Sequence, residues 1–241
     1  MNYQPREYRN YVKANDLIRF EVIEKETDLL VLAKTNLFEA TMSAVIKYRQ
    51  EIENYIKTDE KFLSSLAPIS VPSKAPLIIK AMASATKRVN VGPMAAVAGA
   101  ISEFVGKELL LLSDELIVEN GGDIFLKIDR VRKMGIYAGN STFTGKIALE
   151  LDPRKEPFSI CTSAGTVGHS FSFGKADAII VISSNACLAD AAATAIGNEV
   201  KEVSDIDKAL NLARKIKGLD GVLIIKDDQM GALGKLKIVA L

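Results

Sequence analysis

Hydrophobic residues in the first third of the chain recur with two different periods. Residues 18–24 and 28–33 are apolar runs separated by Lys-Glu-Thr, a pattern typical of a β-hairpin. Beyond them, apolar residues recur at helical spacing, which predicts an amphipathic helix over residues 37–57. These apolar residues are Phe38, Met42, Val45, Ile46, Ile52 and Ile56. A turn-rich segment from Pro68 to Pro76 follows, and the small residues of 92–106 predict a second, closely packed helix.

From residue 115 onwards the pattern changes to short apolar runs. Their connections contain Gly, Asn or Pro, as antiparallel β structure requires. The expected strands are 115–119, 123–128, 134–139, 146–151, 158–163 and 176–183, with closing strands at 222–226 and 235–241. Two helices are expected near 187–200 and from Ser204 to Gly218. Strands followed by paired helices favour an α+β layered fold over a doubly wound parallel sheet.

The composition is that of an ordinary globular protein. A chain of 241 residues fits a single domain, with two subdomains meeting near residues 68–90 as the alternative. Its 31 Lys plus Arg nearly balance 30 Asp plus Glu, which argues against a nucleic-acid partner. The two cysteines and the polar N-terminus favour the cytoplasm, and the uncharged stretch 91–102 is too short to cross a bilayer. A homodimer is compatible with the small-residue helices.

The first residues of the chain interleave aromatic and basic side chains. An RNA-binding arm is one interpretation, but Glu7 and Asp16 dilute the positive charge. An edge strand with one solvated face is the preferred interpretation. The interleaved residues are Tyr3, Arg6, Tyr8, Arg9 and Tyr11.

The stretch Glu119 to Ile124 reads ENGGDI and lies between two expected strands. Asn-Gly-Gly-Asp is a strong signal for a hairpin turn, and that role alone accounts for it. The paired glycines Gly121 and Gly122 would also let a ligand contact bare backbone, with Asp123 accepting hydrogen bonds. From the residues alone, the turn without a ligand is favoured.

The stretch from residue 159 reads SICTSAGTVGHSFSFG and contains the only histidine of the chain, His169. Hydroxyls and backbone amides in such a loop suit an anionic group such as phosphate, and His169 is a candidate proton carrier. Cys161 is a candidate nucleophile, although a small core residue is its commoner role. A solvated connection is the alternative for the loop. The candidate ligand residues are Thr162, Ser163, Gly165 and Thr166.

The stretch CLADAAATAIGNE, residues 187–199, places Asp190 and Thr194 four residues apart, on one face of the expected helix. A carboxylate and a hydroxyl are hard oxygen ligands that suit Mg²⁺ shared with substrate phosphates. In isolation, an Asp that favours the helix start and a Thr that fills a gap are the simpler interpretation.

These stretches, taken in order, resemble the ApbE family, whose characterised members are FAD:protein FMN transferases that use Mg²⁺ to attach FMN to a threonine of a target protein. GPMAAVAGAISE, ENGGDI, CTSAG, VGHSF and LADAAATA match its motifs over roughly residues 80–200. Nearly the whole chain is similar to an ApbE-related family of archaea and anaerobic bacteria.

The resemblance implies layered antiparallel sheets with helices around a central cleft. It implies Asp190 and Thr194 as Mg²⁺ ligands, the Gly121–Gly122 turn as a ligand seat, and FAD or another nucleotide as the phosphorylated ligand. It also implies a protein acceptor. The chain departs from the family at two places: Ala98 aligns with a lysine of ApbE enzymes, and Ser-Phe-Ser-Phe follows His169 where the family has His-x-x-Asp-Pro.

Three hypotheses from different classes follow. The first is an enzyme that binds a flavin or other nucleotide with Mg²⁺ and acts as a transferase. The second is a sulfur carrier in thiol biosynthesis, with a persulfide on Cys161. The third is a ligand-binding protein without catalysis. The first is preferred.

Overall fold

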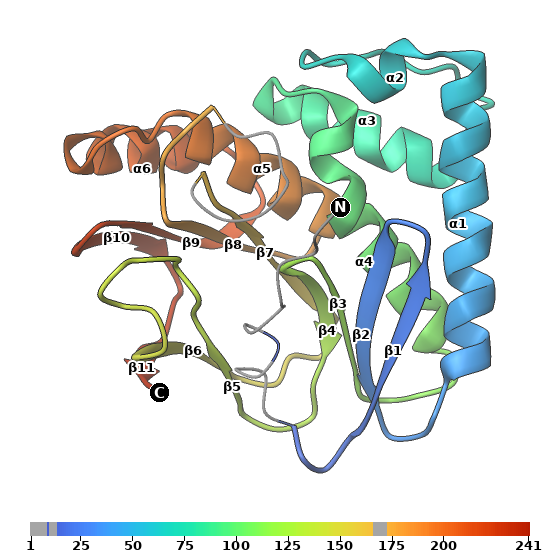
Figure 1. The fold of residues 1–241 in the computed structure, drawn as a ribbon, viewed down its shortest axis with the longest axis horizontal. Helices are drawn as coiled ribbons and strands as arrows, with labels where there is room; N and C mark the ends of the chain where they lie inside the picture. Colours follow the sequence, from blue (N-terminus) through green and yellow to red (C-terminus); the bar gives the residue numbers. More distant parts are fainter. Residues whose placement is uncertain (1–8, 10–13, 166–172) are drawn as a thin grey trace.

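The computed structural model describes Arg9, residues 14–165 and residues 173–241. An eight-stranded sheet carries helices on one face and a three-stranded sheet on the other (Figure 1). The strands are β1 (Ile18–Glu24), β2 (Thr27–Ala33), β3 (Leu116–Asn120), β4 (Asp123–Lys127), β5 (Arg132–Gly135), β6 (Ile147–Leu151), β7 (Phe158–Ser163), β8 (Ala178–Ser183), β9 (Leu219–Lys226), β10 (Gln229–Gly234) and β11 (Ile238–Ala240). The helices are α1 (Phe38–Thr58), α2 (Lys61–Ser64), α3 (Leu77–Val89), α4 (Val97–Leu109), α5 (Ala186–Asn198) and α6 (Ile206–Lys215), with 3₁₀ turns η2 (Pro93–Ala96) and η3 (Val203–Asp205).

The strand order explains how distant segments of the chain meet. The large sheet runs β1-β2-β3-β4-β7-β8-β9-β10, and the small sheet runs β11-β6-β5. Every strand pair in the described residues is antiparallel. The fold is therefore α+β with layered antiparallel sheets, as the sequence predicts. Since β4 pairs with β7 directly, the turn before β4 and the end of β7 lie at the same edge of the sheet.

Side chains on the central strands alternate between two buried faces. In β2, Leu29 and Val31 join the core beneath α1, α3 and α4, whereas Leu30 and Leu32 join the core facing the small sheet. The same alternation continues through β8 and β9, whose helix-side residues pack against α5 and α6. A sheet covered on both faces has near-continuous apolar strands, and all six residues of β8 are buried.

The predicted elements of the first half are confirmed with one exception. The hairpin and the first long helix lie where expected, but the helix predicted over 92–106 is the 3₁₀ turn η2 followed by α4, which ends at Leu109. Helices α2 and α3 and the edge strand β10 are additional elements. The helix expected from Ser204 begins at Ile206 and ends at Lys215, after a capping box formed by Glu202 and Asp205.

Residues on both sides of the 68–90 region share one hydrophobic cluster. Val45 of α1, Met82 of α3 and Leu188 of α5 are members of the same buried core. Near the N-terminus, Arg9 lies outside any strand, and the other residues of the interleaved aromatic and basic segment lie outside the described part of the chain.

Among the described residues, none of the helices taken singly has the length and apolarity to cross a membrane. Residues Leu77–Val89 and Pro93–Leu109 meet that test only as a pair, and the pair is bent by 104°.

Helix α4 approaches the sheet most closely at Gly106. A β-carbon at this position would lie 2.2 Å from Cδ1 of Phe125, a fully buried ring on β4. We expect Gly106→Ala to lower the free energy of unfolding by about 1–2 kcal/mol, because overpacking outweighs the helix propensity gained. Urea denaturation measures this change. In a Phe125→Leu background the loss should largely disappear, and an equal loss in both backgrounds would show that the ring is not the obstacle.

Candidate functional site

Helices α4 and α5 bind each other's N-termini through carboxylates. Asp190 of α5 accepts a hydrogen bond from the amide of Gly99 in the first turn of α4 (Oδ2 to N, 2.8 Å). Glu103 of α4 accepts one from the amide of Ala186, the first residue of α5 (Oε2 to N, 2.6 Å). First-turn amides have no partner inside their own helix, so each carboxylate satisfies a donor of the other helix.

The close contact of α4 and α5 requires a glycine. A β-carbon on Gly99 would lie 2.6 Å from the carbonyl oxygen of Ala186 and 2.8 Å from Cβ of Asp190. The carbonyl of the neighbouring residue Ala98 accepts a hydrogen bond from Asn120 at the end of β3 (Nδ2 to O, 3.1 Å). The N-terminus of α4 is thus held by α5 on one side and by the β3–β4 hairpin on the other.

Asp123 connects this helix pair to β7. Its side chain is buried, and its Oδ1 accepts a hydrogen bond from the amide of Thr162 at 3.2 Å. Cys161 lies beside this carboxyl group. Asp123 also lies close enough to Asp190 that the charge of Asp190 opposes its ionisation.

Burial weakens the acidity of both carboxyl groups, and the charge of Asp190 weakens that of Asp123 further. Burial, and then the charge of Asp190, raise the pKa of Asp123 well above its usual value. Burial likewise raises the pKa of Asp190 from 3.8 to about 7, although the amides of Gly99 and Ala98 oppose the rise. The pair therefore holds protons near neutral pH that ordinary aspartates release, and a bound cation would displace them.

The β3–β4 turn is built from two glycines in left-handed conformations. The φ angles are +64° at Gly121 and +100° at Gly122, where other residues would be strained. The amide of Gly122 donates to Oε1 of Glu119 at 2.8 Å. Gly121 is exposed, and a β-carbon on Gly122 would lie 3.7 Å from Cβ of Thr162. The turn and the end of β7 are therefore neighbours.

The two ends of the loop that follows β7 lie next to each other. The amide of Gly165 donates to the carbonyl of Ala176 at 2.8 Å, and a β-carbon on Gly165 would lie 2.1 Å from the carbonyl oxygen of Gly174. Gly174 in turn lies against the end of α5, where a β-carbon would meet the carbonyl oxygen of Gly197 at 1.8 Å. Thr166 and His169 lie outside the described residues.

The remaining sequence-predicted residues differ in accessibility. Thr162 is partly exposed and Ser163 is buried. Thr194 is partly exposed, one helical turn beyond Asp190 on α5. The structure thus brings Gly121, Gly122, Asp123, Cys161, Thr162 and Asp190 together at one edge of the large sheet.

Cys161 is fully buried, and its thiol donates to the carbonyl of Ala186 with an Sγ–O distance of 3.6 Å. Burial, then the charges of Asp123 and Asp190, raise the pKa of this thiol well above its usual value. A thiol rather than a thiolate is present at neutral pH, which favours the packing role over the nucleophilic one. Cys187 is likewise buried with a raised pKa.

The donor set near Asp190 fits a hard cation that is shared with a ligand. No cluster of three or more His, Cys, Asp or Glu suited to a metal occurs in residues 14–165 and 173–241. The chain can offer the carboxylates of Asp190 and Asp123 and the hydroxyl of Thr194. Mg²⁺ is commonly held by one or two carboxylates plus waters and substrate phosphates.

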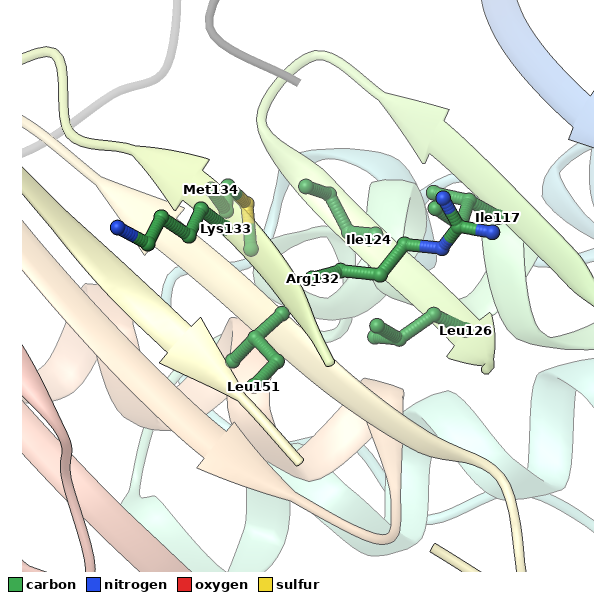
Figure 2. A pocket seen from close by; sticks show the side chains of 7 residues that line it. All are labelled: Ile117, Ile124, Leu126, Arg132, Lys133, Met134 and Leu151. Carbon is green, nitrogen blue, oxygen red and sulfur yellow. The ribbon is translucent and has the colours of Figure 1, made fainter. Parts of the chain in front are cut away.

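Local sequence patterns did not indicate Glu119, Glu103, Asn120 or Arg9 as site residues. Each one acts on a partner through a hydrogen bond or ion pair. Glu119 directly precedes the Asn-Gly-Gly turn, and this position is the one local signal that could have indicated its role. A pocket between the two sheets is lined by none of the predicted site residues (Figure 2).

The architecture is that of the ApbE flavin transferases. The apo form of Pseudomonas stutzeri flavinyl transferase ApbE superposes with a TM-score of 0.60 at 12% identity, covering 90% of this chain and 94% of that one. The ApbE protein of Thermotoga maritima gives a TM-score of 0.52 at 13% identity, covering 86% of this chain and 94% of that one. These similarities concern the fold.

The chain belongs to the family described as AbpE bacteria, whose model matches residues 9–232. A UPF0280 protein of Methanococcus maripaludis strain C5 is 42% identical over 223 residues, covering 90% of each chain. A UPF0280 protein of Methanocaldococcus jannaschii is 42% identical over 221 residues, covering 89% of this chain and 90% of the relative. A UPF0280 protein of Methanocella arvoryzae is 39% identical over 217 residues, covering 89% of this chain and 88% of the relative. An ApbE-related family with archaeal members, the one the motifs resemble, is thereby confirmed.

The raised pKa of Asp190 predicts a pH-dependent stability. Between its unfolded pKa of 3.8 and its folded pKa of about 7, the folded protein binds more protons than the unfolded chain. Stability from this group is therefore present at low pH and lost as the pH rises through that window. In Asp190→Asn the amide oxygen can still accept a hydrogen bond from Gly99. We expect the free energy of unfolding of this variant, relative to that of wild type, to increase by about 1–3 kcal/mol as the pH is raised from 4 to 8. Urea denaturation measures this difference. Parallel pH profiles for the two proteins would contradict the assignment.

Burial of both cysteines predicts that they are unreactive in the folded protein. In the metal-free protein at pH 7.5, a thiol reagent such as DTNB should label neither Cys161 nor Cys187 at the rate seen in 6 M guanidinium. The variants Cys161→Ala and Cys187→Ala assign any labelling that does occur. Rapid native labelling of Cys161 alone would restore the persulfide hypothesis.

Proposed function

We propose that this protein binds a phosphorylated nucleotide, with FAD as the first candidate, together with Mg²⁺. The observation that carries the proposal is the carboxyl pair Asp123–Asp190, whose pKa values are both raised at the N-terminus of α4. A divalent cation bound by two such buried carboxyl groups would stabilise their ionised forms. The phosphates of a nucleotide would supply the metal ligands that the chain does not. The family and the ApbE fold support the choice of FAD.

In this model Asp190 and Thr194 hold the cation, and Asp123 completes the acidic side of the site. Bound Mg²⁺ would neutralise charge on the pyrophosphate of the nucleotide. The exposed Gly121 and the partly exposed Gly122 leave bare backbone for the ligand, and the adjacent Thr162 supplies a hydroxyl. The predicted roles of Ser163, Gly165 and Thr166 in receiving phosphates, and of His169 in carrying a proton, complete the proposal.

The proposed reaction is transfer of the FMN moiety of FAD to a hydroxyl of a protein acceptor with release of AMP; the structural neighbour from Pseudomonas stutzeri is a flavinyl transferase. Ala98 stands where ApbE enzymes carry a lysine. Binding without transfer is the second candidate, and AMP release separates the two.

Calorimetric titration of FAD with and without Mg²⁺ tests the binding proposal. We expect Mg²⁺ to be required, and Asp190→Asn and Thr194→Val each to weaken Mg²⁺-dependent binding about tenfold or more, because each removes an oxygen ligand. Asp177→Asn is the matched control, since Asp177 is a buried aspartate that accepts a hydrogen bond from the amide of Asp227 and pairs with Lys226. It should lower stability while leaving the Mg²⁺ dependence unchanged.

Incubation with FAD, Mg²⁺ and a threonine-containing acceptor protein then tests for chemistry. Release of AMP with flavin attached to the acceptor supports a transferase. Binding without AMP identifies a ligand-binding protein. Absence of FAD binding under any condition would rule out the flavin proposal.

A further inference from the structure

Arg9 is the one residue of the first 13 that the structure describes, and it is 4% exposed. Its guanidinium contacts three strands: it lies 3.4 Å from Glu21 of β1 and also contacts Asp28 of β2 and Glu119 of β3. Nε donates to Oε2 of Glu119 at 2.7 Å, Nη1 donates to Oδ1 of Asp28 at 3.0 Å, and Nη2 donates to the carbonyl of Asp28 at 2.8 Å. A buried guanidinium held in this way has a fixed position, because each of its three nitrogens donates a hydrogen bond.

Glu119 transmits this position to the β3–β4 turn. One of its oxygens receives Arg9, and the other receives the amide of Gly122. Glu119 is 1% exposed, and one of its oxygens pairs with the guanidinium of Arg9. Removing the guanidinium would release the oxygen that Arg9 holds, and with it the constraint on the oxygen that receives Gly122.

The turn needs such a contact because its backbone is otherwise permissive. Gly121 and Gly122 both have positive φ, and glycine populates several backbone regions at little cost. The hydrogen bond from Gly122 to Glu119 selects one orientation of the peptide groups between Glu119 and Asp123. The same orientation leads the chain into Asp123, whose carboxyl belongs to the acidic pair.

We propose that Arg9 is a positioning residue for the ligand turn: it clamps Glu119, which holds the amide of Gly122 and so presets the backbone offered to the nucleotide. The inference rests on the proposed function, since it assigns the turn a role in binding the phosphorylated ligand. Arg9 itself does not touch the ligand in this scheme. Its contribution is preorganisation, which lowers the cost of ordering the turn upon binding.

The chain provides a matched control at the other end of β3. Arg132 is also buried, and it pairs with the fully buried Glu115, next to the start of the same strand, and with Asp16. Figure 2 shows Arg132 on β5, facing the apolar side chains of β3 and β4. Loss of either arginine removes a buried ion pair, but only Arg9 is linked to the ligand turn.

The experiment compares Arg9→Met, Arg9→Lys and Arg132→Met with wild type. Three quantities are measured: the Kd for FAD in the presence of Mg²⁺, hydrogen exchange of the Gly122 amide by NMR without ligand, and Tm. We expect Arg9→Met to raise the Kd and to accelerate Gly122 exchange, each about tenfold or more. Arg9→Lys keeps the positive charge but loses the planar guanidinium, so its Kd and exchange rate should lie between those of wild type and Arg9→Met. Arg132→Met should lower Tm, with the Kd and the exchange rate within about twofold of wild type.

Unchanged Kd and Gly122 exchange in Arg9→Met would overturn the proposal. So would an equal rise of both in Arg132→Met, because the effect would then follow from general destabilisation. If Arg9→Met does not fold, Arg9→Lys decides by the same criteria. If wild type binds no FAD, the proposed function fails, and the exchange measurement alone decides whether Arg9 positions the turn.

Discussion

The reciprocal capping of α4 and α5 determines where the other parts of the candidate site lie. Asp190 and Glu103 each terminate the partner helix, and Gly99 allows the two backbones to meet. Lys107 pairs with Glu103, so one of the two caps is charge-compensated within the helix pair. The other cap, Asp190, lies beside Asp123. The two aspartates therefore lie together at one place, where the start of β4 lies beside the end of β7.

Strand β3 links this edge to the rest of the molecule. Buried glutamates stand beside its first residue and at its fourth, and each is held by an arginine from a remote segment. One pair holds the seam between the two sheets, and the other holds the turn that precedes Asp123. Strand β3 therefore connects both buried ion pairs to the candidate site, and the sheet holds the residues of the site in place.

Local patterns in the sequence were sufficient for the elements that a single segment specifies. The Asn-Gly-Gly-Asp turn, the hairpin of β1 and β2, and the helical spacing of Asp190 and Thr194 all depend on residues close in the chain. Strand β10 lacks an apolar alternation because it is an edge strand with several exposed side chains, and its sequence QMGALG gives no strand signal. Helix α3 does carry an apolar face, with Ile78, Ile79 and Met82 buried, but it follows a proline-rich segment that draws attention to turns.

The features that local patterns could not supply are contacts between distant residues. Gly99 and Asp190 are 91 positions apart, and Arg9 and Glu119 are 110 apart. The raised pKa values of Asp123 and Asp190 arise from burial by several elements at once, which no spacing within one element encodes. The motif order, through the resemblance, named residues that the structure brings together, whereas the capping role of Asp190 and the clamp on Glu119 required coordinates.

The glycines that close the loop after β7 bear on how proteins with this frame diversify. Gly165 and Gly174 meet backbone to backbone against the end of α5, so the sheet and helix on either side are fixed without reference to what lies between. Seven positions, 166–172, are bounded in this way. Because the residues on both sides of that interval are joined to each other, substitutions within it need not move the strand and helix that carry Asp123 and Asp190. The sequence of the interval and the position of the acidic pair can therefore change independently.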